Sequence, residues 1–163
     1  MAAPLIELEQ VLEQLIVEHE KLLRHIDSQQ AAMKKLDARA LEASAQEQEA
    51  ARLRITALEA RRRAIIAQLS QTMRLGPKPT LAQVADASPA ARARLLALRQ
   101  RLKQAATAVS NRAQIASRVA GAVLGHLNTA VRLISGAVEQ AGLYTRNGTP
   151  QSSARIGLLE AVG

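Results

Sequence analysis

Cysteine, tryptophan and phenylalanine are absent from this chain of 163 residues, and Tyr144 is its single aromatic side chain of the Phe/Trp/Tyr group. The lack of cysteine excludes disulfides, thiolate metal sites and cysteine nucleophiles, and it fits a reducing compartment. The hydrophobic core must therefore be aliphatic. Alanine and leucine, two strong helix formers, account for 33 and 23 residues, so the composition predicts an all-α protein.

A secretory signal and a membrane-spanning run are also missing. The first residues, MAAPLIELEQ, lack a basic region followed by a long apolar stretch, so we expect no signal peptide and a chain that begins here. The least charged stretch, 119–131, ends at Arg132 and falls short of the roughly 20 apolar residues that a spanning helix needs. We expect a soluble protein that does not insert into a membrane.

Glycine and proline do not occur between Pro4 and Gly76, a span too long for loops. Apolar residues within it recur at alternating spacings of three and four, which is typical of coiled-coil-like helices. We predict a first helix from about Leu5 to Leu36 and a second helix capped by Asp37. A single uninterrupted helix is the alternative, but it would be about 100 Å long and would bury its apolar stripe only in an oligomer.

A connector at 76–89 separates this region from a third long helix. The apolar pattern resumes at Ala90 and runs to Gly142, which suits the position after a helix end. Residues 143–163 are rich in Thr, Asn, Gly, Pro and Ser, and we expect them to form a mobile tail. Within the connector, the second helix is ended by Gly76, Pro77 and Pro79. Thr80 can cap one short helical turn, and Ser88 followed by Pro89 provides an N-cap and a first-turn proline for the third helix.

These segments predict an all-α, elongated fold in which an antiparallel hairpin of long helices packs against a third long helix as a coiled-coil-like bundle. We divide the chain into an N-terminal hairpin at 1–75, the connector at 76–89, the third helix at 90–142 and a flexible tail at 143–163, which make one structural domain plus a tail. The oligomeric state stays open, because Gln29 and Gln48 at seam positions can specify register within one chain or between two.

Positive charge is concentrated in the C-terminal half. Residues 1–73 carry ten Lys/Arg and eleven Asp/Glu, whereas residues 74–163 carry twelve and three, which accounts for the net charge of +8. A basic half can bind nucleic acid by releasing counterions from phosphates. Acidic residues of the first helix can instead neutralise part of this excess through an antiparallel neighbour. Since only Tyr144 is available for stacking on bases, we rank nucleic-acid binding last among the candidate functions.

Residues for catalysis or metal binding do not cluster in the sequence. His19 and His25 lie six residues apart, on different faces of one helix, and His126 is distant in sequence, so no zinc set results. The carboxylates of the first helix resemble a solvated flank with partners four residues away, such as Glu20 with Arg24. No glycine-rich phosphate loop follows a strand. We therefore predict neither enzyme activity nor a metal or cofactor.

The segment 119–138 is apolar over more of its circumference than a narrow seam. Such a helix must be enclosed, and burial under the first two helices is the simplest solution. The alternative is a docking surface for an amphipathic helix of another protein, with Arg132 at its edge. Exposed glycines at Gly121, Gly125 and Gly136 weaken the helix by about 1 kcal/mol each, and the first two form a GxxxG motif that permits close approach of another backbone.

Several segments together resemble the flagellar export chaperones of the FlgN type. They are the Leu/Glu-rich start LIELEQVLEQLIVEHEKLLRHI, the stretch LRITALEARRRAIIAQL, the connector TLAQVADASP, the later helix RLLALRQRLKQAATAVSNRAQIASRVAGAVLGHL and the turn LYTRNGT. The resemblance lies in the layout and in weak motifs, and it spans most of the chain.

This resemblance implies a cytoplasmic, non-catalytic chaperone. It would bind the C-terminal helical regions of flagellar hook-associated (filament junction) proteins, prevent their premature assembly and deliver them to the flagellar type III export apparatus. The competing class is a structural coiled-coil scaffold without a client, and a homo-oligomer is compatible with either.

For a chaperone, we expect the client helix to be held by the C-terminal third of the chain. The first two helices satisfy each other's seams, so the large apolar surface without an obvious partner in the chain lies there. The predicted client-binding residues are Val123, Leu127, Val131, Ile134, Val138, Leu143, Tyr144, Ile156, Leu158 and Leu159.

Overall fold

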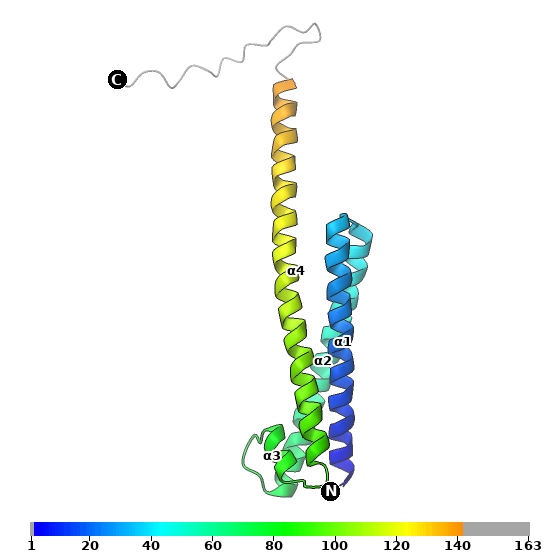
Figure 1. The fold of residues 1–163 in the computed structure, drawn as a ribbon, viewed down its shortest axis with the longest axis vertical. Helices are drawn as coiled ribbons and strands as arrows, with labels where there is room; N and C mark the ends of the chain where they lie inside the picture. The colour runs from blue at the N-terminus through cyan, green and yellow to red at the C-terminus, as the bar shows by residue number, and fades with distance from the viewer. Residues whose placement is uncertain (1, 142–163) are drawn as a thin grey trace, which may run out of the picture. The chain divides into compact units, whose positions relative to one another are not determined.

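The computed structural model describes residues 2–141 of the chain, with the side chains of residues 3–137. These residues form four helices, α1 (Ala2–Lys35), α2 (Ala38–Met73), the short α3 (Leu81–Asp86) and α4 (Arg92–Ala141) (Figure 1). No strand occurs in this part of the chain, and α1, α2 and α4 pack together, so the predicted all-α fold of long helices is confirmed. The predicted tail at 143–163 lies outside the described residues.

The chain divides into two compact units. The first comprises residues 1–120 and therefore contains α1, α2, α3 and the part of α4 up to Ala120. The second begins at Gly121, within α4. The hydrophobic clusters of the described residues belong to the first unit.

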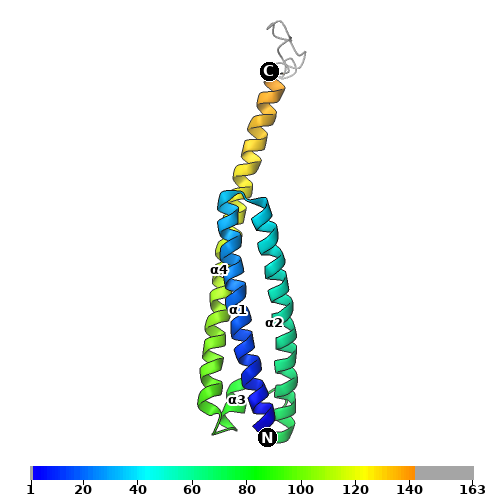
Figure 2. The ribbon, with the colours of Figure 1, turned by 90° about the vertical axis from the view of Figure 1, so that its right-hand side faces the viewer.

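Helices α1 and α2 form an antiparallel hairpin, as predicted, and they lie side by side in Figure 2. Two ion pairs show which residues of the two helices lie opposite each other. Glu7 near the start of α1 pairs with Arg61 of α2 at 2.8 Å, and Glu18 pairs with Arg54 at 2.7 Å. As the residue number rises along α1, the number of its partner on α2 falls. The two helices therefore run in opposite directions along a shared seam.

The turn of this hairpin is made by two residues. Leu36 adopts the left-handed conformation with φ of 53°, and the Asp37 backbone N–H donates to the Ala32 carbonyl oxygen at 3.0 Å. The Asp37 side chain then accepts a hydrogen bond from the Ala40 N–H at 3.0 Å, which satisfies one free donor of the first turn of α2. The predicted break at Asp37 is confirmed, and a single uninterrupted helix is excluded.

The main hydrophobic cluster joins the hairpin to α3 and the start of α4. Its buried side chains come from all four helices, and burial of one such large aliphatic side chain contributes about 1.5 to 3 kcal/mol. They are Leu8, Val11, Leu12, Leu15 and Ile16 of α1, Ile65, Ile66 and Leu69 of α2, Leu81, Val84 and Ala85 of α3, and Leu95 and Leu98 of α4.

A second, smaller cluster lies farther along the hairpin and consists of Leu22, Ile26, Ala51 and Ala116. Beside it, Gln48 of α2 is buried and its amide nitrogen lies 3.4 Å from the His25 carbonyl oxygen of α1. This seam glutamine therefore contacts a partner within its own chain.

The connector between α2 and α4 combines two caps and a turn. Arg74 ends α2 in the left-handed conformation with φ of 55°, and its N–H donates to the last turn of the helix. Thr80 caps α3 with a complete capping box, in which the Thr80 hydroxyl accepts from the Gln83 N–H and the Gln83 side chain accepts from the Thr80 N–H. The predicted role of Thr80 is confirmed.

The predicted start of the third long helix is wrong by two residues. Ala91 N–H donates to the Ser88 carbonyl oxygen at 3.0 Å, so the chain first makes a turn, and α4 begins at Arg92 instead of Ala90. The Ser88 hydroxyl does not cap the helix but lies 3.9 Å from the Met73 sulfur at the end of α2. The turn separates the serine from the free N–H groups of α4, which explains why it cannot serve as the N-cap.

Candidate functional site

The part of α4 beyond Ala120 presents large apolar side chains to solvent. The exposed fractions of Leu127, Val131 and Ile134 are 43, 60 and 64%, and Val123 is half-buried. Leu124 and Leu133 are also exposed. Burial under α1 and α2, the simplest expectation for this segment, stays a prediction, because the segment belongs to the second unit of the chain.

The predicted client-binding residues of α4 share one side of the helix. At 3.6 residues per turn, the spacings of three and four between Val123, Leu127, Val131 and Ile134 place them in one stripe along the axis. This stripe is called the α4 face below. The remaining predicted residues extend past it: the side chain of Val138 lies outside the described side chains, as do Leu143, Tyr144, Ile156, Leu158 and Leu159, which lie outside the described residues altogether.

Arg132 and the glycines of this segment lie on the side of the helix that faces away from the α4 face. Arg132 is five residues from Leu127, which corresponds to a rotation of about 140°, so helix geometry corrects the expectation that it borders the stripe. Gly125 and Gly136 lie on the same distant side. A Cβ atom added at Gly121, Gly125 or Gly136 would meet no atom of the described structure within 4 Å.

The charge of α4 is predominantly positive, and seven of its eight cations lie between Arg92 and Arg118. Residues 87–138 contain eight Lys/Arg and no Asp/Glu, and the rest of the chain carries fourteen of each sign, so this segment alone supplies the net charge of +8. Two of its cations pair with α1, since Arg94 meets Glu9 at 3.1 Å and Arg112 meets Asp27 at 3.1 Å. These pairs run in the same direction along both helices, so the basic excess is partly neutralised by a parallel neighbour and not by the antiparallel one that the sequence suggested.

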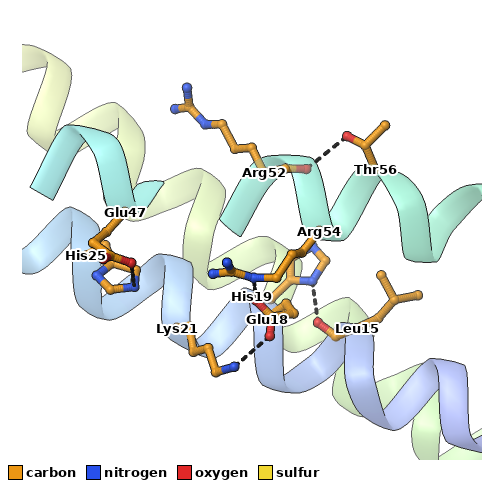
Figure 3. Close-up of polar contacts among 9 residues, drawn as sticks. All are labelled: Leu15, Glu18, His19, Lys21, His25, Glu47, Arg52, Arg54 and Thr56. Carbon is orange, nitrogen blue, oxygen red and sulfur yellow. Dashed lines mark hydrogen bonds and ion pairs between the residues drawn. The ribbon is translucent and has the colours of Figure 1, made fainter. Parts of the chain in front are cut away.

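A second polar feature lies between α1 and α2, where Glu18 is almost fully buried (Figure 3). Its carboxylate accepts hydrogen bonds from Lys21 and Arg54, each at 2.7 Å. Burial raises the pKa of Glu18, but the hydrogen bonds and charges of Lys21 and Arg54 outweigh it and hold the pKa below its usual value. Glu18 therefore remains ionised at neutral pH, and its hydrogen bond with Arg54 links α1 to α2.

Sequence reasoning missed this cluster because it assigned the acidic residues of α1 to a solvated flank. The signal that could have found it is the spacing itself, since Glu18 lies three residues after Leu15 and four before Leu22, two seam leucines that are buried. His19, the residue assigned to the seam, is only half-buried. Its Nδ1 lies 2.7 Å from the Leu15 carbonyl oxygen, and because a carbonyl can only accept, this nitrogen is the donor.

The histidines and acids do not assemble a reactive centre in the described residues. His25 Nε2 lies 4.0 Å from the carboxylate of Glu47 (Figure 3), an exposed residue of α2. Groups of three or more His, Asp or Glu suited to a metal ion are absent from the described part of the chain. In the same part, none of the helices is long and apolar enough to cross a membrane.

Comparison with known proteins identifies the family. The model of the family described as FlgN protein matches residues 1–152, which is most of the chain. The chain belongs to the FlgN family. Membership implies a role as a flagellar export chaperone, and FlgN chaperones are not enzymes. The family also binds hook-associated proteins. Neither a curated protein nor a solved structure matches the chain.

Proposed function

We propose that this FlgN protein is a cytoplasmic chaperone that binds the C-terminal helical regions of the flagellar hook-associated (filament junction) proteins. It keeps them from assembling prematurely and delivers them to the flagellar type III export apparatus. Membership of the family supports the general role, and the clients named here are the finer part of the proposal. No nucleic acid and no membrane insertion are involved.

The observation that carries the proposal is the exposed α4 face. Monomeric proteins rarely leave a contiguous row of large aliphatic side chains in water, and such rows mark interaction sites. Leu127, Val131 and Ile134 recur at the spacing by which one amphipathic helix packs along another. A client segment that later forms helical contacts in the filament junction carries a matching apolar stripe, which this face covers reversibly.

The client site comprises the α4 face, which is Val123, Leu127, Val131 and Ile134, together with Val138 and a continuation through Leu143, Tyr144, Ile156, Leu158 and Leu159. The helical part supplies aliphatic contacts on a regular scaffold. The continuation adds the single aromatic side chain of the chain, Tyr144, and four further aliphatic residues. Aromatic anchors of this kind are common among the residues that dominate binding energy.

A capture experiment with extract from flagellated cells tests the proposal. The tagged full chain should retain hook-associated proteins, identified by mass spectrometry. Truncation of a central contact, Leu127→Ala or Ile134→Ala, should weaken capture by about 1 to 3 kcal/mol, or roughly 5- to 150-fold, without changing the helix content. Leu53→Ala is the matched control, because Leu53 is an exposed leucine on α2, outside the proposed site.

Two results would contradict the proposal. If no flagellar component is retained by the full chain, the client role fails and the scaffold class is favoured. If Leu53→Ala reduces capture as much as Leu127→Ala does, the loss reflects a general effect of removing exposed leucines and the α4 face is not the site. A version of the chain that ends at Gly142 tests the two parts of the site separately. If it captures as much client as the full chain does, the continuation is not part of the site.

A further inference from the structure

Helix α2 carries a second stripe of apolar residues, interrupted once by Gln46, on the side away from the hydrophobic clusters. Leu53 lies near its middle, about 160° around the helix from the buried Leu69, and is 63% exposed. The members recur at alternating spacings of three and four, the pattern by which helices pack along one another. They are Ala43, Gln46, Ala50, Leu53, Ala57, Ala60, Ala64 and Ala67, all of them exposed except the half-buried Ala50. This stripe is called the α2 face below.

The α2 face has both a projecting side chain and a hollow. Leu53 projects into solvent, whereas Ala57, one turn along the helix, is small and lines a groove between α1 and α2. Val17 of α1, which is 46% exposed, and Leu58 line the same groove. A leucine from another helix fits beside such an alanine as a knob fits a hole. Because the knob and the hole lie on one face, the surface is complementary to its own copy, as a two-fold interface requires.

The charges beside the α2 face reverse their sign along the helix. Acids flank its first half and bases flank its second half, namely Glu42, Glu47 and Glu49, then Arg54, Arg61 and Arg63. Two parallel α2 helices would therefore place like charges side by side. In an antiparallel pair centred between Leu53 and Ala57, each leucine meets the alanine of the second copy. Glu49 then lies beside Arg63 of the second copy, and Glu47 lies beside its Arg61.

We propose that two copies of this chain associate through the α2 face as an antiparallel, two-fold dimer. The charge pattern decides the partner, because it complements itself in this one orientation. Arg63 is exposed, and its Nε donates to the backbone carbonyl oxygen of Glu59 at 3.3 Å, a contact that leaves its charge uncompensated. Glu49 is also exposed, with Arg52 at 4.0 Å. The inference goes beyond the proposed function, since the α2 face shares no residue with the proposed client site.

Sedimentation equilibrium of the free full chain tests the dimer, and charge reversal tests its orientation. Glu49→Arg should raise the dissociation constant of the dimer about tenfold or more, because the new cation faces Arg63 of the second copy. Adding Arg63→Glu to the same chain should restore the constant to within about threefold. Glu49 and Arg63 are about 21 Å apart along α2, so this rescue cannot arise within one copy. A chain that stays monomeric up to about 1 mM, or a double variant as weak as Glu49→Arg alone, overturns the proposal.

A further variant, Ala57→Glu, places a charge against Leu53 of the second copy and should weaken the dimer about tenfold or more without changing the helix content. Ala97→Glu, at an exposed alanine of α4, is the matched control, and equal weakening by it overturns the assignment of the α2 face.

Capture of hook-associated proteins is measured separately, so failure of the proposed function is distinguishable from failure of this inference. Ala57→Glu and Leu53→Ala should both weaken the dimer and leave capture unchanged. If Ala57→Glu abolishes capture while the unsubstituted chain is monomeric at every concentration, the α2 face binds another protein, and the second copy is not its occupant.

Discussion

Arg54 of α2 donates from Nε to the carboxylate of Glu18 on α1 across 2.7 Å, although the two residues are 36 positions apart in sequence. Lys21, one turn along α1, donates to the other oxygen of the same carboxylate at 2.7 Å. Glu18 is nearly buried while both cations keep substantial exposure, so the carboxylate is the fixed centre of the group. The hairpin is therefore held by an ionic contact as well as by its leucine seam.

Replacement of Glu18 by glutamine should lower the free energy of unfolding by about 1 kcal/mol at neutral pH, because the partners are partly solvated and only the charge is removed. The folded-state pKa of Glu18 is depressed, so its stabilisation is present above the pKa of the unfolded chain and is lost as pH falls through the folded-state pKa. The difference between the two proteins should shrink in acid. Denaturant unfolding at several pH values measures it, with Glu20→Gln, at an exposed position on α1, as the control. A gap that stays constant into acid would refute the assignment.

Substitution of Leu36 by glycine should raise the stability of the hairpin by about 0.5 to 1 kcal/mol. Leu36 has a φ of 53°, a conformation that costs a residue with a Cβ about 1 to 2 kcal/mol and costs glycine little. Its side chain is exposed, so its removal forfeits little packing. Thermal or denaturant unfolding measures the gain. Leu36→Ala separates conformation from side-chain size: if alanine stabilises as much as glycine does, backbone strain is not the cause.

The variant Gly125→Ala should strengthen the second part of α4 without weakening client capture. An added Cβ meets no atom of the described structure within 4 Å, and alanine favours a helix by about 1 kcal/mol over glycine. Gly125 lies far around the helix from Leu127, so the α4 face is unchanged. Slower amide exchange over 121–134 is the expected result. A tenfold loss of capture would instead place the glycine side of the helix in the interface.

Raising salt from low to moderate concentration should slow association of the client with the chain more than it shortens the lifetime of the complex. The α4 face is aliphatic, whereas the exposed cations of α4 act at long range and are screened over about 10 Å at 0.1 M salt. Association and dissociation rates of a captured hook-associated protein measure both effects. A tenfold fall in affinity, together with binding to random DNA, would favour nucleic-acid binding.

Much of the fold was accessible from the sequence because its determinants are local. The gap in glycine and proline between Pro4 and Gly76 predicted the hairpin, and Asp37 and Thr80 cap the helices that they were expected to cap. Both caps act within three residues of themselves, so a short window of sequence contains all the information. The prediction that Ser88 caps the third long helix was wrong because the chain makes a turn from Ser88 to Ala91 before the helix begins. Whether these residues form a turn or the first turn of the helix depends on the packing around them.

The site was less accessible because exposure is a property of the packed chain. The stripe of Val123, Leu127, Val131 and Ile134 follows the same spacing as the buried stripe of Leu95 and Leu98, and spacing alone cannot tell covered from uncovered residues. Pairing between Glu18 and Arg54 likewise depends on the register of the hairpin, which the sequence does not specify directly. The direction of α4 relative to α1 could not be read from charge counts either.

All members of the two hydrophobic clusters, including the partly buried residues packed against them, lie between Leu5 and Ala116. The α4 face begins at Val123, so the residues that fold the bundle and the residues proposed to contact the client are different sets. Mutations that alter recognition therefore need not pass through an unstable intermediate. Substitutions in the α4 face can therefore change which client is bound while the residues that fold the bundle stay the same.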